Sequence, residues 1–136
     1  MQHAEKLVLP NELICDEALI EEGGQGFRFF VRSCDIPEWS GTVLHRSESH
    51  QPAFLIKYRD EIYAYLNRCA HIEMEMDWIA GKFFDTDKQY IICATHDAHY
   101  LPDSGLCISG PCPVGARLIK LPIQVKQSKV YFISSN

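Results

Sequence analysis

Short hydrophobic runs separated by polar turns dominate this chain. Within residues 61–66, aliphatic side chains alternate with two tyrosines, so the two sets are expected to point to opposite faces of one β-strand. No window of helical length repeats its hydrophobic residues with the period of an α-helix. Strands are predicted at residues 27–31, 53–58, 61–66, 89–92, 99–101, 119–125 and 130–133. The pattern therefore predicts an all-β protein.

Turn-forming residues separate these predicted strands. Arg59-Asp60 joins two of the runs into a hairpin, and Pro102–Gly105 forms a further turn. Residues 35–51 are polar and contain proline and glycine, so they are predicted to form a surface loop. Strands that recur every ~8–12 residues favour a sandwich or a barrel.

Length and charge restrict the class of protein further. A chain of 136 residues corresponds to one domain, here interpreted as an N-terminal extension at 1–12 and a single domain at 13–136. No apolar run approaches the ~20 residues that span a bilayer, and the first ten residues lack the apolar core of a signal peptide. We therefore expect a cytoplasmic protein. The net charge of −5 disfavours nucleic acid and anionic membrane as partners, and it favours a protein with a basic face.

Two short runs contain the residues most suited to chemistry. Cys69-Ala70-His71 combines a thiolate with an imidazole, and Cys93-Ala94-Thr95-His96 does the same. A two-iron cluster with chemically different irons uses this mixture, with two cysteines on one iron and two histidines on the other. Tetrahedral zinc is the alternative, although zinc sites usually group like ligands in sequence. Each run fits the tip of a hairpin, so two facing loops are expected to enclose one cluster.

The spacing C-x-H followed by C-x-x-H resembles that of the Rieske iron-sulfur family, and the likeness covers most of the chain. The resemblance implies a Rieske-type antiparallel β-sandwich of three sheets, with a small cluster-binding subdomain at approximately 67–115 formed by two hairpin loops. It also implies one 2Fe-2S cluster, held by cysteines on the inner iron and histidines on the outer iron: Cys69, Cys93, His71 and His96.

The resemblance extends to residues around the cluster. Gly110, Pro111 and Pro113 belong to a GPCP stretch that is similar to the family's proline loop, which covers the cluster. Tyr100 matches a tyrosine that, in high-potential members of the family, donates its hydroxyl to the sulfur of a ligand cysteine. In this chain that cysteine would be Cys69. A strand tyrosine packed in the core is the alternative.

The chain departs from the family pattern at four positions. Glycine usually follows soon after each ligand histidine, where this chain has Glu73 and Asp97. Since glutamate rarely adopts a left-handed backbone conformation, either these positions have ordinary dihedrals or the loops are reshaped. In the cytochrome bc type, a disulfide between two further cysteines joins the cluster loops. This chain has Met74 and Ala94 at the matching positions, so it lacks that disulfide. The chain therefore looks more like the soluble ferredoxins of the family.

Four cysteines lie outside the ligand pattern: Cys15, Cys34, Cys107 and Cys112. A reducing cytosol would keep them as thiols, and we interpret them as buried structural residues. Because only four residues separate Cys107 from Cys112, a disulfide between these two is the alternative.

These features predict a one-electron carrier rather than an enzyme. A flavin-dependent reductase is the expected donor, and an oxygenase or another terminal oxidoreductase is the expected acceptor. Two alternatives are the small Rieske subunit of a larger reductase, such as nitrite reductase, and a redox-sensing regulatory module. His99 has no catalytic partner in the sequence, so we interpret it as an ordinary strand residue rather than a fifth ligand.

Overall fold

The structure is a computed structural model of the chain. It describes residues 6–36, 50–67, 81–85, 87–93, 98–110 and 115–133. Within these ranges the regular elements are β-strands, apart from two single-turn 3₁₀ helices at Glu17–Leu19 and Ser33–Asp35. No helix in the described part of the chain has the length and apolar character needed to cross a bilayer. The all-β class predicted from the hydrophobic pattern is confirmed.

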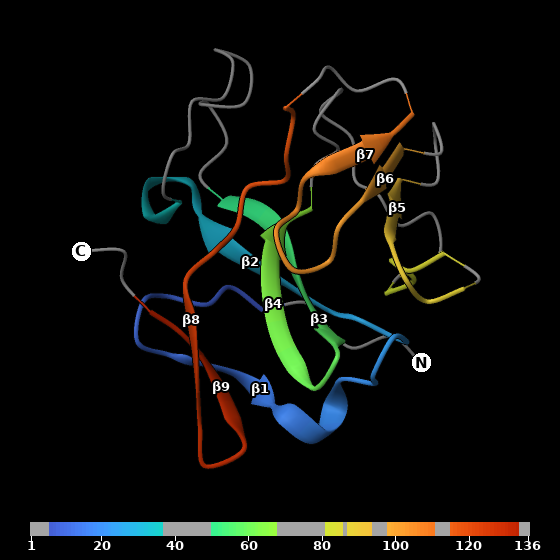
Figure 1. Cartoon of the computed structure of the whole chain (residues 1–136). Helices are drawn as coiled ribbons and strands as arrows, with labels where there is room; N and C mark the ends of the chain where they lie inside the picture. Colours follow the sequence, from blue (N-terminus) through green and yellow to red (C-terminus); the bar gives the residue numbers. More distant parts are fainter. Residues whose placement is uncertain are drawn as a thin grey trace.

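The described strands form three antiparallel sheets of three strands each (Figure 1). The first sheet has the order β1-β9-β8, with strands at Leu13–Asp16, Lys129–Phe132 and Ile123–Lys126. The middle sheet has the order β2-β3-β4, with strands at Phe27–Arg32, His50–Tyr58 and Glu61–Leu66. The third sheet has the order β5-β6-β7, with strands at Ile91–Cys93, Ala98–Tyr100 and Cys107–Ser109.

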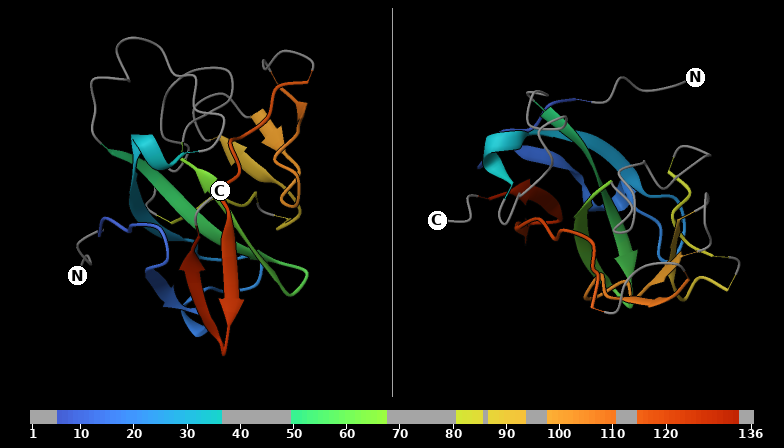
Figure 2. Two further views of the ribbon diagram at one scale, coloured as in Figure 1. Left: turned by 90° about the vertical axis from the view of Figure 1, so that its left-hand side faces the viewer. Right: turned by 90° about the horizontal axis from the view of Figure 1, so that it is seen from above.

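The middle sheet is packed on both faces. On one face, Ala53 and Leu55 belong to a core with residues of β1 and β9. On the other face, Phe54 and Ile56 belong to a second core with residues of β5 and β6. Figure 2 shows the β8–β9 hairpin on one side of this sheet and the β5–β7 sheet on the other. Because both faces are covered, β3 is hydrophobic along most of its length instead of alternating.

The alternation predicted for residues 61–66 is confirmed. Ala64 and Leu66 lie in the core against the first sheet, whereas Tyr65 lies in the core against the third. Neighbouring residues of a strand point to opposite faces, so β4 contributes to both cores. The aliphatic residues of β4 therefore pack on one face of the middle sheet, and its tyrosines pack on the other.

Several predicted strand boundaries differ from the structure, and one strand was not predicted. β3 begins at His50, because it pairs with β2 as far as Arg32, so the loop predicted at 35–51 extends two residues too far. The strand predicted at 119–125 is divided in the structure. Residues 119–121 hydrogen-bond to β4, whereas β8 begins at Ile123. Pro122 lies between the two parts and has no N–H to donate. β7 was not predicted, since it is short and largely exposed.

The β3–β4 turn confirms the predicted hairpin at Arg59-Asp60. Both residues have positive φ, at 52° and 67°, which is the geometry of the tight turn that joins twisted strands. The Glu22 carboxylate accepts hydrogen bonds from the backbone N–H groups of Arg59 at 2.6 Å and Asp60 at 2.8 Å. A side chain distant in sequence thus caps the turn.

A buried hydrogen bond joins the middle sheet to the turn that follows β6. The Tyr65 hydroxyl donates to the Pro102 carbonyl at 2.6 Å, out of contact with solvent. Burial raises the pKa of this hydroxyl above its ordinary value, and the nearby Asp103 raises it further, so the group stays a proton donor. At Gly105, where φ is +78°, a Cβ would lie 2.9 Å from the Tyr65 ring. The ring and the turn are therefore in close contact.

We expect replacement of Glu22 by alanine to lower the free energy of unfolding by about 1 kcal/mol, because two backbone donors of the β3–β4 turn lose a charged acceptor. Urea unfolding of E22A and of E21A measures the difference. Glu21 is a matched control, since it is also exposed and removes the same charge. Equal stability of the two variants would contradict this role for Glu22.

We expect Tyr65→Phe to lower the free energy of unfolding by about 1–2 kcal/mol, since the buried Pro102 carbonyl loses its donor. Tyr63→Phe is the control, because the Tyr63 hydroxyl donates to the exposed Glu61 carboxylate at 3.2 Å. Thermal unfolding of both variants checks the prediction, and an effect of Y63F as large as that of Y65F would be inconsistent with it.

Candidate metal centre

Cys93 is the one predicted ligand that lies among the described residues. It ends β5, where its side chain is fully buried and is not part of a disulfide. Cys69, His71 and His96 lie outside the described residues, so their predicted ligation remains a prediction. Within the described ranges, no group of three or more histidine, cysteine or carboxylate side chains is placed to hold a metal ion.

The chain on either side of residues 68–80, which contain the first Cys-x-His run, is attached to the body of the protein. At the N-terminal side, the Asn67 N–H donates to the Pro52 carbonyl at 2.8 Å. At the C-terminal side, the Gly26 N–H donates to the Gly81 carbonyl at 2.7 Å. Both flanking residues are therefore held by partners on elements distant in sequence.

The four residues 94–97, which include His96, connect two paired strands. Cys93 on β5 is opposite Ala98 on β6, so the described chain leaves and re-enters the same sheet at neighbouring positions. The Ile92 N–H donates to the Phe83 carbonyl at 2.8 Å, which attaches β5 to the segment after Gly81. The prediction that a strand delivers Cys93 to a hairpin end agrees with this pairing.

The Cys93 thiol lies in an apolar environment. It shares a hydrophobic core with Tyr65 of β4 and Tyr100 of β6, and all three side chains are fully buried. Tyr100 is therefore in the core, as the simpler interpretation of this residue expected. Its predicted hydrogen bond to Cys69 involves a residue outside the described ranges and stays a prediction.

Gly110 brings the chain after β7 close to the start of β6. Its φ is +103°, and a Cβ at this position would lie 2.7 Å from the Ala98 Cα. Only glycine fits this approach without displacing one of the two backbones. Pro111 and Pro113 of the predicted proline loop lie outside the described residues.

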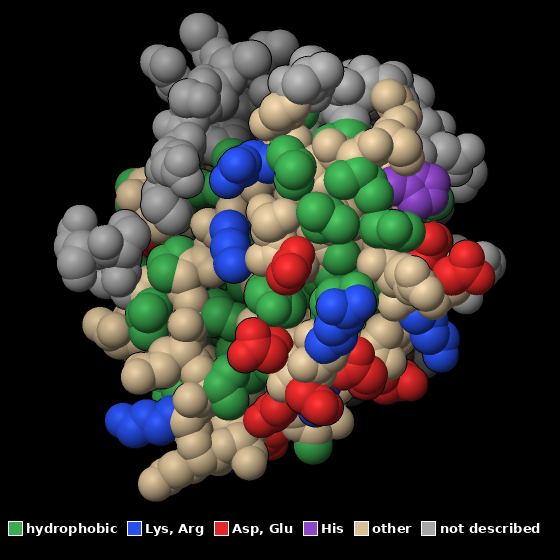
Figure 3. Space-filling model, viewed as in Figure 1, with side chains coloured by type: hydrophobic (Ala, Val, Ile, Leu, Met, Phe, Trp, Pro, Cys, Tyr) green, Lys and Arg blue, Asp and Glu red, His purple; other side chains and the backbone are tan. Residues whose placement is uncertain are grey.

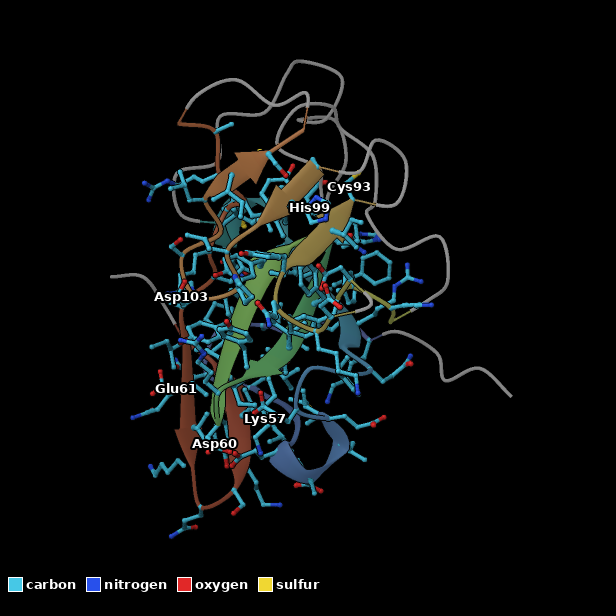
Figure 4. The ribbon with its side chains drawn as sticks, turned by 45° about the vertical axis from the view of Figure 1, so that its right-hand side comes forward. Lys57, Asp60, Glu61, Cys93, His99 and Asp103 are labelled. Carbon is cyan, nitrogen blue, oxygen red and sulfur yellow. The ribbon has the colours of Figure 1, made fainter. Side chains whose placement is uncertain are left out.

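His99 points away from the core that contains Cys93. It is paired with Ile92 in β5 and lies between Ala98 and Tyr100, whose side chains are buried on the other face of the sheet. Its ring contacts that of Tyr90 edge-on at a centroid distance of 6.0 Å. Figure 4 shows Cys93 and His99 side by side on neighbouring strands. The arrangement agrees with an ordinary strand residue.

The remaining cysteines differ in state. Cys15 is a buried thiol, and burial raises its pKa to about 11, so it matches the predicted structural role. Cys34 is a thiol but is exposed rather than buried. Cys107 is disulfide-bonded, so its interpretation as a buried thiol was wrong. It lies half-exposed on β7, and its N–H donates to the Ala116 carbonyl at 2.9 Å. The spacing of the cysteines in the sequence does not predict this contact.

The contacts that hold the chain beside the first run join residues far apart in the sequence. At Gly26, a Cβ would lie 2.7 Å from the Phe83 ring, so the backbone passes directly over that ring. Gly81 and Phe83 are more than 50 residues away from Gly26 in the sequence, so no local pattern predicts these contacts.

The donor chemistry suits an iron-sulfur group. Cys93, buried at the end of a strand and not part of a disulfide, provides one sulfur donor. The backbone next to it is hydrogen-bonded, so a ligand there is held in a defined position. The residues around Cys93 therefore fit a cluster bound through thiolate.

Comparison with known proteins agrees with this chemistry. Residues 28–126 match the Rieske [2Fe-2S] domain family. No curated protein sequence matches the chain. Among solved structures, the chain is similar to the ferredoxin of carbazole 1,9a-dioxygenase from Nocardioides aromaticivorans IC177, with 15% identity, a TM-score of 0.62, and coverage of 93% of this chain and 99% of that one.

Two further structures have the same fold. The ferredoxin of Sphingomonas yanoikuyae B1 is 13% identical, with a TM-score of 0.58 and coverage of 91% of this chain and 98% of that one. The terminal oxygenase of carbazole 1,9a-dioxygenase from Novosphingobium sp. KA1 is 16% identical, with a TM-score of 0.62 and coverage of 93% of this chain but only 31% of that one. The likeness thus spans nearly the whole of the small ferredoxins and less than a third of the oxygenase.

The family match covers more than half of the sequence, and the three-sheet architecture agrees with it. A Rieske domain binds one 2Fe-2S cluster, a group that exchanges single electrons. This chain belongs to the Rieske [2Fe-2S] family.

Proposed function

We propose that this protein is a ferredoxin-type one-electron carrier. In this proposal, two thiolates hold the inner iron and two imidazoles hold the outer iron: Cys69, Cys93, His71 and His96. The observation that carries the proposal is the position of Cys93, which is buried at the end of β5 within a Rieske domain. The proposal extends this ligand role to the other three residues through the spacing of the two runs.

The proposed cysteine and histidine ligands would give the two irons different affinities for an electron. The cluster supplies reversible uptake of a single electron. Neutral imidazoles place less negative charge on their iron than thiolates do, so His71 and His96 favour electron uptake at that iron. Tyr100 is proposed to donate its hydroxyl to the Cys69 sulfur, and Gly110, Pro111 and Pro113 are proposed to cover the cluster. The hydrophobic side chains around Cys93 keep water from the sulfur side.

An oxygenase is the proposed acceptor, and a flavin-dependent reductase is the proposed donor. Support comes from similar structures that are described as complexes of an oxygenase with a ferredoxin in carbazole 1,9a-dioxygenase, including one with 19% identity and a TM-score of 0.59 over 88% of this chain and 98% of that one. We propose a cytoplasmic location for this exchange. A large subunit that co-purifies stoichiometrically would instead favour the alternative of a fixed reductase subunit.

The charge distribution suggests where a partner docks. The described residues contain eleven acidic and eleven basic side chains, so they contribute nothing to the net charge of −5. Residues 68–80 and 94–97 together contain four carboxylates and one arginine. The excess negative charge is therefore concentrated in sequence around the proposed ligands, and we propose a basic docking face on the partner.

A second group of carboxylates lies elsewhere. Acidic side chains gather on the surface over the β3–β4 turn (Figure 3). Figure 4 shows Asp60 and Glu61 at the opposite end of the molecule from Cys93. One carboxylate of this region, Glu22, is already occupied by the turn. This end of the molecule offers a control surface for experiments on docking.

We expect His71→Ala and His96→Ala each to abolish the Rieske-type electron paramagnetic resonance signal of the dithionite-reduced protein, because an imidazole ligand is lost from the outer iron. Iron and acid-labile sulfide analysis accompanies the spectra. His50→Gln is the control, since His50 begins β3 and contacts the Phe30 ring edge-on. Unchanged spectra in either alanine variant, or stoichiometric zinc in a colourless wild-type protein, would overturn the proposed function.

We expect the second-order rate of electron transfer from the reduced protein to cytochrome c, a basic redox protein, to fall as ionic strength rises. Stopped-flow absorbance measures this rate. Glu73→Gln should weaken the salt dependence, because it removes a charge close in sequence to the proposed ligand His71. Asp60→Asn should leave it unchanged, since Asp60 lies at the far end of the molecule. Equal effects of the two variants would argue against docking at the ligand loops.

A further inference from the structure

The third sheet has one face buried in the core and one face that points away from it. Ile92 on β5 and His99 on β6 are paired across the two strands, and both residues are half-buried. Their neighbours along the strands, among them Cys93 and Tyr100, are fully buried on the other face. Ile92 and His99 therefore mark the side of the sheet that lies away from the core, which we call the outer face.

β7 adds the most exposed apolar side chain of this sheet. Cys107 packs against the core, so its neighbours Leu106 and Ile108 point to the outer face. Leu106 is half-buried, whereas Ile108 is 45% exposed. A Cβ built on Gly115, in the segment that returns beside β7, would have no atom within 4 Å. Ile108 therefore projects beside an open part of the surface.

The outer face combines apolar side chains with a positive charge at its edge. Figure 3 shows hydrophobic side chains gathered on the visible surface over the third sheet, beside a histidine. Arg117 lies at the β7 edge, because its backbone forms an antiparallel bridge with Leu106. It is exposed, and it forms no ion pair with a carboxylate in the described part of the chain. This cation is therefore available to a carboxylate on another protein.

The outer face lies next to the proposed metal centre. Cys93 and His99 are side by side on neighbouring strands (Figure 4). β5 ends and β6 begins on either side of residues 94–97, which include the proposed ligand His96. A protein bound to the outer face would therefore be separated from Cys93 by the thickness of one sheet. This position favours a redox partner as the occupant.

The size of the outer face restricts what can occupy it. Three strands of three residues form a sheet of roughly 10 by 14 Å, from a rise of ~3.3 Å per residue and ~4.8 Å between strands. A stable dimer needs about 800 Å² from each protein, whereas electron-transfer complexes are at the small end of the range. The outer face is therefore too small to hold a second copy of the chain stably, and it suits a transient complex.

We propose that the outer face, centred on Ile108, is the apolar core of the surface on which the electron acceptor docks. The acceptor presents a small apolar face and a carboxylate that meets Arg117. This inference rests on the proposed function, and it adds a short-range contact to the charges around the proposed ligands. Charges at the rim of an interface mainly change the rate of association, whereas truncating a buried central contact mainly speeds dissociation.

Electron transfer to two proteins of opposite charge tests the apolar contact. We expect Ile108→Ser to lower the second-order rate several-fold with basic cytochrome c and with the acidic copper protein plastocyanin, because an apolar contact does not depend on charge. The dependence of each rate on ionic strength should stay as in wild type. Stopped-flow absorbance measures the rates. Val125→Ser is the matched control, since Val125 is 44% exposed and lies on β8, away from the third sheet (Figure 1). Equal rates in the two variants would overturn the proposal.

Charge reversal tests the edge of the outer face. At low ionic strength, we expect Arg117→Glu to raise the rate with cytochrome c several-fold and to lower the rate with plastocyanin. Lys126→Glu makes the same change in net charge at an exposed position on β8, so its effects should be much smaller. Equal effects of the two reversals would place Arg117 outside the docking surface and overturn its assignment.

Hydrogen–deuterium exchange locates binding without electron transfer. We expect zinc-substituted cytochrome c, which does not take up the electron, to slow exchange of the wild-type backbone amides at 98–109 but not at 123–132. No protection at 98–109 would overturn the docking surface. Slower exchange of the same amides when the protein is concentrated alone would show that a second copy occupies the face, and it would overturn the choice of occupant.

The two proposals fail in different ways. If the protein holds no iron and sulfide, the proposed function fails, whereas hydrogen exchange still decides whether the outer face binds a protein. If the Rieske-type resonance is present in I108S and its electron-transfer rates equal those of V125S, the proposed function stands and the docking surface is excluded.

Discussion

Burial of the middle sheet on both faces is the constraint on which the rest of the structure depends. The two cores share β3 and β4 and are separated only by the thickness of one sheet. The third sheet has strands of three residues, too short to be stable without a packed face. Its contact with Phe54 and Ile56 is therefore what gives Cys93 a defined position.

The chain beside the proposed ligands is held mostly by backbone contacts to distant elements. Residue 67 bonds to β3, and Gly81 bonds to the turn at Gly26. Tyr65 adds a buried side-chain link from β4 to the turn after β6. These links connect the strands before and after the ligand runs through one rigid core. An electron carrier benefits from this arrangement, because ligands on a rigid support move little when the charge of the cluster changes.

The cysteines illustrate how surroundings determine the chemistry of one residue type. Burial keeps Cys15 protonated, whereas Cys34 is an exposed thiol. Cys93 is buried at the end of a strand within the Rieske domain, and Cys107 is bridged at the base of a loop. Sequence neighbourhood distinguished Cys93 from the others, because the nearby histidine completes a ligand pattern. It could not distinguish Cys107 from Cys15, since a disulfide depends on how the chain folds back.

The sequence by itself determined the family, the all-β class, the β3–β4 hairpin and the division of β4 between two faces, because these depend on neighbouring residues and on a ligand spacing. Only the tertiary structure decided what depends on residues far apart in the chain. The pairing of residues 119–121 with β4, the approach of Gly26 to Phe83 and the bond from Tyr65 to Pro102 are of this kind. Neither β7 nor the bridged state of Cys107 has a local hydrophobic pattern of its own, since both arise from pairing across a loop.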